Sequence, residues 1–573
     1  MSETFNQLAM GAGPWPAPQT SHLRPNLRIR MPDGVELVGD LYLPKGRGPW
    51  PVIIERTPYG AAALGPLGDC YAAHGYLFLA VDVRGRFRSG GTWDPLSHEK
   101  EDGPAVIKWA VALPECNGKV GTRGHSYAGA NQLMAAPHAG PALKAMVVYV
   151  APGDAFDNVP FQGGAYDLSD LMWAWFQTGP TGHSAQEEEL EEGEAADRAY
   201  EARDAEILAA LHARPFGEVD VRLGLRMPFF REWVKHWKRD AFWKERSWLP
   251  GLGRAKVPAL HISGWWDNNG RGSVLAHRAL GGAAGGQRLI LGPWDHSLEA
   301  PLLDDLPEHE AALVNRAALR DAFNDELAWF EQHLKGIGRS LPPAEILITG
   351  AWQWVEAADW PPVSAVQTEW FLDASGGLDT RPARPGKRKY IFDPANPNPI
   401  NYPEAPVDLA PYDTSPDLCD DALTYRSPLL SDDVLAMGDV RVILNAATTA
   451  RDVDWVARLT DEYPDGRSIF IRDGILRARF HRGFARPHFV PPGQFAEHAI
   501  DLWHVGHLFR KGHRIRVEIR SSARGRWDVN PGDGGNLATS TANVVSTQTI
   551  SHGTLRGSRL LLPVVPTALL GGS

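Results

Sequence analysis

The chain opens with alternating hydrophobic and polar positions and continues with short, unbroken hydrophobic runs. Residues 26 to 44, NLRIRMPDGVELVGDLYLP, alternate around Pro32-Asp33-Gly34 and predict an antiparallel hairpin. The runs that follow are rich in β-branched or aromatic residues and end at Gly or Pro: WPVIIERTPYG, YLFLAVDVRG and LKAMVVYVAP. Runs of this kind are typical of strands that are buried on both faces.

Helical patterns such as EDGPAVIKWAVAL separate these predicted strands. Strands that alternate with helices indicate a mostly parallel sheet covered by helices. The same pattern resumes after residue 250 with VPALHISGWWD and QRLILGPWDH, and it closes with the helical segment LRDAFNDELAWFEQHLKG. We therefore expect an α/β core formed by residues 1–155 and 251–345.

Two other regions differ from this core in their pattern. Residues 156–250 contain the acidic stretch SAQEEELEEGEAADRAYEARDAEILAALHARP and the aromatic stretch MPFFREWVKHWKRDAFWKERSW, which predict a helical cap inserted into the core. Residues 346–573 nearly lose helical periodicity and show short alternating segments separated by turn signals such as Pro464-Asp465-Gly466. This part predicts an antiparallel β-sandwich.

Length and charge limit the class of protein. A chain of 573 residues, 43% of them hydrophobic, has enough apolar material for several buried cores. The formal net charge is −11, and the Lys and Arg residues are scattered along the chain rather than clustered. We expect no nucleic-acid partner, since such proteins carry a basic stripe.

The sequence predicts neither a disulfide framework nor a metal site. The three cysteines, Cys70, Cys116 and Cys419, are widely spaced and form no C-x-x-C pair. No segment approaches the ~18 uninterrupted apolar residues of a membrane span, and the first residues lack the pattern of a secretory signal. We expect a cytoplasmic protein with no membrane association. The sequence leaves open whether it forms a homo-oligomer.

Ser126 is the candidate nucleophile. It lies in GTRGHSYAGANQLMA, between a short predicted strand and the predicted helix AGANQLMAAP. A serine on such a sharp strand-to-helix turn needs small residues two positions before it and two or three after it. Gly124, Ala128 and Gly129 meet this requirement.

Two downstream residues can complete a catalytic triad. A serine hydroxyl needs a base to remove its proton, and the base needs a carboxylate to orient it. Asp267 ends the predicted strand ALHISGWWD, and His296 follows RLILGPWDH, in the order acid then base that this turn type requires. Asp295 is an alternative acid, but it adjoins His296 in sequence and has no strand of its own.

The oxyanion of a tetrahedral intermediate also needs hydrogen-bond donors. The backbone N–H of the residue after the nucleophile, Tyr127, is one of them. The His-Gly-Gly-Gly segment of lipases is absent, and RTPYG stands after the strand PVIIE instead. Its position offers the phenol of Tyr59 as the second donor.

Taken together, the motifs RTPYG, VDVRGRFRSGG, GHSYAG, GWWD, GPWDH and LKG, followed by KGHRIRVEI, resemble the cocaine esterase and X-prolyl dipeptidyl peptidase-like family of α/β-hydrolases. The resemblance extends from about residue 26 to residue 565. It implies an α/β-hydrolase core with a helical cap and a C-terminal jelly roll. It also implies a triad of Ser126, Asp267 and His296, with an oxyanion hole made by the Tyr59 hydroxyl and the Tyr127 amide.

The resemblance implies hydrolysis of esters or, in some branches, of amide or X-prolyl peptide bonds. Branches that select a free α-amino group resemble one another in carrying carboxylates after the catalytic Asp, where this chain has Asn268 and Asn269. Neutral amides do not offset the desolvation of a buried ammonium group. We therefore expect a serine carboxylesterase for a small-molecule ester, with no cofactor and no metal.

Two alternatives remain open from the sequence. An amidase or acylase, including an X-prolyl or α-amino acyl hydrolase, would use the same triad. The other alternative is a non-enzymatic protein whose β domain has a binding role. The candidate nucleophile, acid, base and oxyanion tyrosine are all present, which argues against it. Candidate pocket residues, which core packing explains equally well in the cap, are Trp173, Trp175, Phe176, Trp233 and Trp237, with Trp266 and Asn269 beside Asp267.

Overall fold

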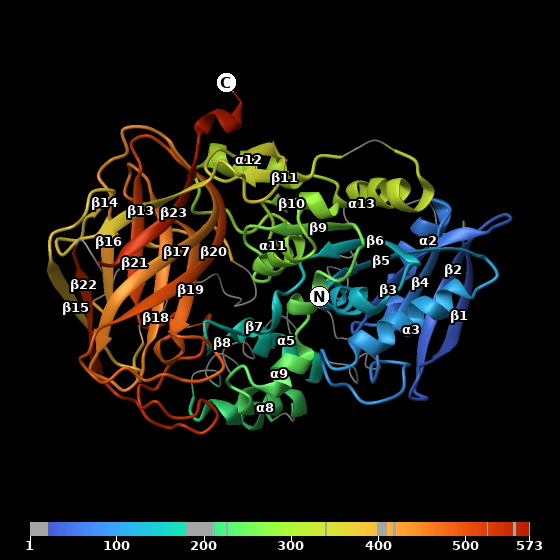
Figure 1. Ribbon diagram of the computed structural model, residues 1–573, viewed down its shortest axis with the longest axis horizontal. Coiled ribbons are helices and arrows are strands. Elements are labelled where there is room, and N and C mark those ends of the chain that lie inside the picture. The colour runs from blue at the N-terminus through green and yellow to red at the C-terminus, as the bar shows by residue number, and fades with distance from the viewer. Residues whose placement is uncertain are drawn as a thin grey trace, which may run out of the picture.

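The computed structural model has an α/β part and a β-rich part side by side (Figure 1). It describes residues 21–178, 210, 213–224, 227–338, 341–397, 409–415, 420–523, 525–553 and 557–571. The predicted acidic helix lies mostly within residues 179–209, outside the described residues, as does Cys419. Cys70 and Cys116 are free thiols.

A ten-stranded sheet forms the centre of the α/β part in the described chain, with the order β1-β2-β4-β3-β5-β6-β9-β10-β11-β12. The strands from β4 to β11 in this order run parallel, and β1, β2 and β12 pair antiparallel. Their bounds are β1 (Ser21–Arg30), β2 (Glu36–Pro44), β3 (Trp50–Thr57), β4 (Leu77–Asp82), β5 (Cys116–His125), β6 (Leu143–Tyr149), β9 (Ala259–Gly264), β10 (Arg288–Gly292), β11 (Ala344–Ile348) and β12 (Gln353–Ala357).

Helices cover both faces of this sheet, which explains its unbroken hydrophobic strands. Ile53 and Phe78 belong to a buried cluster with residues of α2 and α13, whereas Ile54 and Leu79 belong to a second cluster with residues of α3 and α4. Successive strand residues point to opposite faces, so both faces must be apolar. The helices are α2 (Gly65–Ala73), α3 (Glu99–Val111), α4 (Tyr127–Ala135), α11 (Gly270–Ala279), α12 (Glu308–Ala318) and α13 (Ala322–Phe330).

The inserted cap begins with a short hairpin rather than a helix. This hairpin consists of β7 (Asp154–Gln162) and β8 (Ala165–Tyr166), and its turn glycines Gly163 and Gly164 have positive φ. A Cβ atom at Gly163 would lie 1.8 Å from the Ile475 carbonyl oxygen, so only glycine allows the β domain to approach here. The cap helices are α5 (Leu168–Thr178), α7 (Val219–Arg222), α8 (Pro228–Lys235), α9 (Ala241–Arg246) and α10 (Leu249–Leu252).

The C-terminal part is an all-β domain, as the sequence predicts. In its described residues, one sheet has the order β14-β13-β23-β17-β22-β15 with β20 paired to β17, and the other has the order β16-β21-β18-β19. Residues of both sheets form one buried cluster between them. The strands are β13 (Val366–Leu372), β14 (Leu378–Asp379), β15 (Gly386–Phe392), β16 (Ala422–Arg426), β17 (Val434–Thr448), β18 (Asp454–Glu462), β19 (Ser468–Arg477), β20 (Ala496–Phe509), β21 (Arg514–Arg520), β22 (Ser546–His552) and β23 (Arg559–Val565).

The ten-stranded sheet and the β domain meet around β11 and β20. The backbone of Thr349 exchanges hydrogen bonds with β20, and a Cβ atom at Gly506 would lie only 2.7 Å from the Trp265 ring. The boundary predicted between residues 345 and 346 falls inside β11 and stays a prediction, as do the other domain limits.

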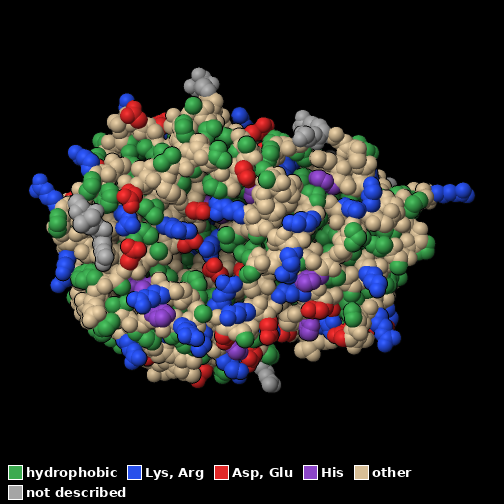
Figure 2. Space-filling view, in the orientation of Figure 1, with side chains coloured by type: hydrophobic (Ala, Val, Ile, Leu, Met, Phe, Trp, Pro, Cys, Tyr) green, Lys and Arg blue, Asp and Glu red, His purple; other side chains and the backbone are tan. Residues whose placement is uncertain are grey.

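Charged side chains are dispersed over the face of the molecule shown in Figure 2, where Lys and Arg alternate with acidic and neutral residues. Within the described ranges, no helix has both the length and the apolar character that crossing a membrane requires. The same residues contain no group of three or more His, Cys, Asp or Glu side chains arranged to hold a metal ion.

Candidate active site

Ser126 stands on a sharp turn between β5 and α4. Its backbone has φ 57° and ψ −119°, a strained conformation for a residue with a side chain. A Cβ atom at Gly124 would lie 2.3 Å from the Ala128 carbonyl oxygen, and one at Gly129 would lie 2.9 Å from the Tyr149 carbonyl oxygen. The small residues that the sequence shows around Ser126 are therefore required by close backbone contacts.

The structure brings Ser126, His296 and Asp267 into one chain of hydrogen bonds. The His296 Nε2 atom lies 3.0 Å from Ser126 Oγ, and its Nδ1 atom lies 2.8 Å from Asp267 Oδ1. A carboxylate only accepts hydrogen bonds, so Nδ1 carries the proton and Nε2 is left as the acceptor that faces the serine hydroxyl.

Asp267 is fully buried, and its neighbours hold the carboxylate in place. The Ser263 hydroxyl donates to Oδ2 at 2.6 Å, and the Asn269 backbone N–H donates to Oδ1 at 2.8 Å. Together with His296, these donors satisfy the buried oxygens, which makes a buried charge acceptable.

The topology of the sheet explains why these residues meet. β6, β9 and β10 are adjacent parallel strands, so the loops after them leave at the same edge. A Cβ atom at Gly264 would lie 1.9 Å from the Trp294 carbonyl oxygen, so the Asp267 and His296 loops pack directly on each other. Asp295 instead accepts the backbone N–H groups of Ser297 and Glu299 and closes its own turn.

Tyr59 lies beside Ser126, at the end of β3. Its hydroxyl accepts a hydrogen bond from Trp173 Nε1 at 3.2 Å. Burial raises the pKa of Tyr59, and hydrogen bonds with the Ser126 side chain, with Trp173 and with the Tyr127 backbone partly offset this rise. The phenol therefore stays protonated near neutral pH and makes hydrogen bonds with both the Ser126 side chain and the Tyr127 backbone.

The Tyr127 side chain is engaged elsewhere. Its hydroxyl donates to Glu99 Oε1 at 2.8 Å and accepts from the Leu96 backbone N–H at 3.0 Å. Its ring stacks on that of Trp173 with centroids 6.0 Å apart. Only the backbone of Tyr127 faces the candidate site.

Two residues that the sequence analysis did not single out support this arrangement. Arg86, from the motif VDVRGRFRSGG, donates from Nε to the Pro58 carbonyl oxygen at 3.0 Å and from Nη2 to Gln177 Oε1 at 2.9 Å. It thus ties the Tyr59 segment to the end of the cap helix α5. Burial lowers the pKa of Arg86 to about 10, and it remains a cation at neutral pH.

His125 packs against the candidate base. Its ring lies 5.2 Å from the His296 ring, edge to face, and makes a hydrogen bond with the His296 backbone. Burial lowers the pKa of His125 well below its usual range, and the nearby His296 and the positive charge of Arg123 lower it further. A neutral ring thus supports His296. The position before Ser126 in GHSYAG was the only sequence signal for it.

The predicted pocket residues lie in different places: some are beside Tyr59 and Asp267, and others pack against the β domain. Trp173 lies beside Tyr59, with its ring parallel to that of Trp233 at 6.2 Å, and Asn269 is joined to Asp267 through its backbone. Trp175 and Phe176 contact each other edge to face at 4.9 Å. Trp266 is 3% exposed and packs toward the β domain, and Trp237 contacts Phe480 of that domain. A contact of these residues with substrate stays a prediction.

Comparisons with known proteins agree with this fold. Residues 33–298 match the family described as X-Pro dipeptidyl-peptidase (S15 family), and residues 335–561 match the X-Pro dipeptidyl-peptidase C-terminal non-catalytic domain. The cocaine esterase of Rhodococcus sp. (strain MB1 Bresler) is 29% identical over 572 residues, covering 94% of this chain and 98% of that protein.

Solved structures show the same architecture over nearly the whole chain. An α-amino acid ester hydrolase aligns with a TM-score of 0.80 and 24% identity, covering 96% of this chain and 97% of its own. An aminopeptidase from a marine sediment Thaumarchaeota archaeon aligns with a TM-score of 0.79 and 23% identity, covering 97% and 99%.

The fold defines the protein as an α/β-hydrolase with an additional β domain. Within that class, the chain belongs to the cocaine esterase and X-prolyl dipeptidyl peptidase-like (CocE/NonD) family.

Proposed function

We propose that Ser126 attacks a carboxylic ester and that the reaction passes through an acyl-enzyme formed on its Oγ atom. The observation that carries this proposal is the hydrogen-bond chain from Ser126 through His296 to the buried Asp267. The protein is a serine carboxylic ester hydrolase by family. The cocaine esterase that it resembles along 94% of its length supports an ester substrate.

In acylation, His296 Nε2 takes the proton of Ser126 as Oγ bonds to the ester carbonyl carbon. The imidazolium formed is stabilised by Asp267, which already accepts the Nδ1 proton at 2.8 Å. His296 then gives its proton to the leaving alcohol oxygen as the ester C–O bond breaks. The acyl group remains on Ser126.

Negative charge on the carbonyl oxygen requires two donors. We assign the Tyr59 hydroxyl and the Tyr127 backbone N–H, because the Tyr59 hydroxyl makes hydrogen bonds with both the Ser126 side chain and the Tyr127 backbone. The raised pKa of Tyr59 keeps its proton available for this bond. Trp173 Nε1–H donates to the phenol oxygen, and Arg86 holds the neighbouring Pro58 carbonyl. Preorganised donors of this kind contribute most when charge develops.

In deacylation, water takes the place of the alcohol. His296 removes a proton from this water as its oxygen attacks the acyl carbon, and the same two donors hold the second oxyanion. The proton then passes to Ser126 Oγ as the acyl C–O bond breaks, and the carboxylic acid product leaves.

The cap supplies the walls next to this centre. α5 carries Trp173 beside Tyr59, and Trp175 and Phe176 follow on the same helix. We propose that this helix contributes the aromatic side of the pocket for an uncharged acyl or alcohol group, together with Asn269 at the start of α11.

A second candidate function, hydrolysis of α-amino acyl compounds, is favoured by Asp170. This residue lies one helical turn before Trp173 on α5, on the same side of the helix. Burial, together with the negative charge of Asp167, raises the pKa of Asp170 well above its usual range. A carboxyl in this state is uncharged, but an ammonium group of a substrate placed beside it would favour its ionised form and pair with it, although Asn268 and Asn269 offer no charge.

The deciding experiment compares a p-nitrophenyl ester with the p-nitroanilide of the same acyl group, using the wild type and Ser126→Ala. Ester turnover that disappears in the variant, with little anilide cleavage, supports the carboxylesterase. Comparable anilide cleavage would support an acylase, and turnover independent of Ser126 would refute the proposed nucleophile.

A further inference from the structure

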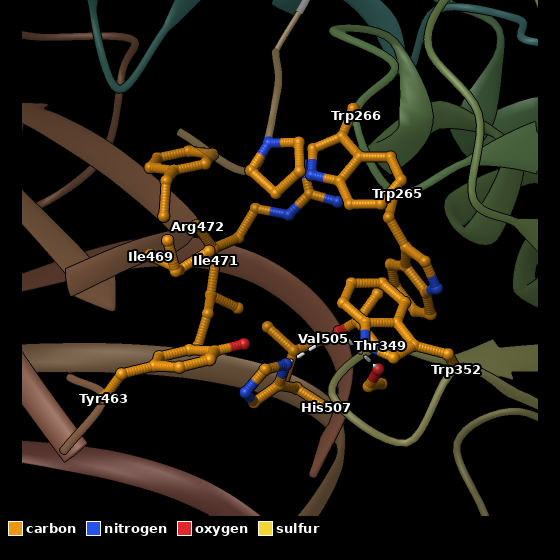
Figure 3. Close-up of a pocket in the computed structure, with 13 residues that line it drawn as sticks. Trp265, Trp266, Thr349, Trp352, Tyr463, Ile469, Ile471, Arg472, Val505 and His507 are labelled. Carbon is orange, nitrogen blue, oxygen red and sulfur yellow. Dashed lines mark hydrogen bonds between the residues drawn. The ribbon is translucent and has the colours of Figure 1, made fainter. Parts of the chain in front are cut away.

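A small cavity lies between the α/β part and the β domain, next to the loop that carries Asp267 (Figure 3). Its volume is about 20 Å³, enough for one or two water-sized bodies. The lining side chains come from both domains and are mostly apolar or aromatic. They include Trp265, Trp266 and Trp352 on one side and Ile469, Arg472 and Val505 on the other.

A bulge in β19 turns Arg472 into this cavity. Leu459 of β18 is paired with Arg472, whereas the next residue, Thr460, is paired with Phe470, so Ile471 is an extra residue in β19. A bulge breaks the alternation of side chains along a strand. Consecutive residues from Ile469 to Arg472 therefore line the same cavity.

The guanidinium group of Arg472 is buried without a hydrogen-bond partner. Its side chain is 1% exposed, and none of its three nitrogens makes a hydrogen bond with a described residue. Among the buried arginines that the structure describes, it alone lacks a hydrogen-bond partner on all three side-chain nitrogens. Figure 3 shows the group extending toward Trp266.

A second buried arginine on the same strand differs from Arg472, because its guanidinium group has hydrogen-bond acceptors. Arg477 donates to Asp454 Oδ2 and to Asp528 Oδ2, each at 2.9 Å. Both carboxylates are buried with it. An arginine has five N–H donors and keeps its charge, so burial without an acceptor is costly.

Asp473 and Asp267 are the carboxylates whose negative charges act on Arg472, and both have other partners. Asp267 is held by Ser263, Asn269 and His296, and Asp473 forms an ion pair with Arg526 at 3.3 Å. Burial lowers the pKa of Arg472 to about 10, with a further contribution from the positive charge of Arg526, and the group is still a cation at neutral pH.

The other polar groups around the cavity do not accept from it either. Thr349 Oγ1 lies 2.8 Å from His507 Nδ1, and the Trp265 indole N–H donates to the Leu347 carbonyl oxygen at 2.6 Å. The charges of Asp473 and Asp267 thus act on Arg472, but its guanidinium N–H groups reach no hydrogen-bond acceptor among the described residues.

We propose that this cavity binds one small monovalent anion, of the size of chloride, through the guanidinium N–H groups of Arg472. The cavity volume suits a monatomic ion rather than a carboxylic acid substrate. A bound anion would stabilise the contact between the two domains, because residues of both surround it. The inference is independent of the proposed esterase activity.

The first test measures thermal unfolding in sodium chloride and in sodium gluconate at the same ionic strength. We expect the Tm of the wild type to rise by roughly 2 °C for each hundredfold increase in chloride above its Kd. Arg472→Met should lose this response, since it fills the space without the charge. The control Arg482→Met, on an exposed arginine of the same domain, should respond as the wild type does.

The second test is a crystal of the wild-type protein soaked in sodium bromide. An anomalous peak within hydrogen-bond distance of the Arg472 guanidinium is expected, and this result does not depend on the folding of any variant. Equal Tm values of the wild type in chloride and gluconate, an equal chloride response in Arg472→Met, or no bromide at Arg472 would each overturn the proposal in favour of water.

Discussion

His296 Nε2 lies 3.0 Å from Ser126 Oγ, although 170 positions separate the two residues in the chain. The contact exists because β5, β6, β9 and β10 lie side by side in the sheet and end at one edge. The turn at Ser126 then lifts its hydroxyl out of the sheet toward the loop after β10.

Replacing Ser126 with Ala should lower kcat for a p-nitrophenyl ester by about 10⁴-fold or more, because no other group can form the acyl-enzyme. The Tm should change little, since the side chain is small and lies at the edge of the core. Initial rates and thermal unfolding measure the two effects. Ser273→Ala, at a buried serine of α11, is the matched control and should keep the wild-type kcat. A nearly unchanged kcat in Ser126→Ala would rule out this nucleophile.

Replacing Tyr59 with Phe should lower kcat by roughly 10² to 10³-fold with a small change in KM, because the hydroxyl acts on the oxyanion rather than on the bound ester. Tyr76→Phe serves as the control, since that hydroxyl is buried among the described residues without a hydrogen-bond partner. Steady-state kinetics on one ester distinguish the two tyrosines. Equal activity of Tyr59→Phe and the wild type would remove Tyr59 from the oxyanion hole.

Replacing Asp170 with Asn tests which substrates the cap accepts. For a simple carboxylesterase, kcat/KM should stay within about twofold of the wild type, both for an α-amino acyl ester and for the same ester without the amine. If Asp170 pairs with an ammonium group, the variant instead loses activity on the amino ester alone, through a raised KM. This selective loss would establish the second candidate function.

Stability should fall as the pH drops below about 6.5, in part because of two buried histidines. His261 and His277 lie with ring centroids 5.8 Å apart, and burial lowers the pKa of His261 to about 3 and that of His277 to about 4. Below the ordinary value of 6.5, the unfolded chain binds protons that the folded protein excludes. Each such histidine costs about 1.4 kcal/mol of unfolding free energy per pH unit until its folded pKa is reached.

Urea unfolding at pH 7.5 and pH 5.0 measures this effect. The loss of stability between the two values should be smaller in His277→Gln than in the wild type. His309→Gln, at an exposed position, should leave the difference unchanged. The same loss in all three proteins would show that His277 does not contribute to it.

Several parts of the fold could be predicted from sequence because their signals are local. The hydrophobic runs around Ile53 and Phe78 identify strands that need cover on both faces, and the structure has helices there. The all-β character of the C-terminal part followed from its alternation. The hairpin of β7 and β8 was not predicted, because its shape depends on the approach of β19 to Gly163.

For the candidate site, the sequence indicated residue types and their order but not the residues that support them. Arg86 and His125 act on Tyr59 and His296 through contacts between distant segments. The sequence also did not indicate that Trp266, a predicted pocket residue, packs in a cluster with residues of the β domain; its contact with substrate stays a prediction.

By itself, the sequence determined the strand and helix pattern, the small residues around Ser126, and the succession of Ser126, Asp267 and His296. Each of these depends on chemistry within a few residues or on the order of motifs. Only the tertiary structure decided that Asp267 is fully buried and satisfied, and that Arg472 is buried without a hydrogen-bond acceptor among the described residues. Burial and hydrogen bonding depend on what the rest of the chain brings next to a side chain, and no local pattern records that.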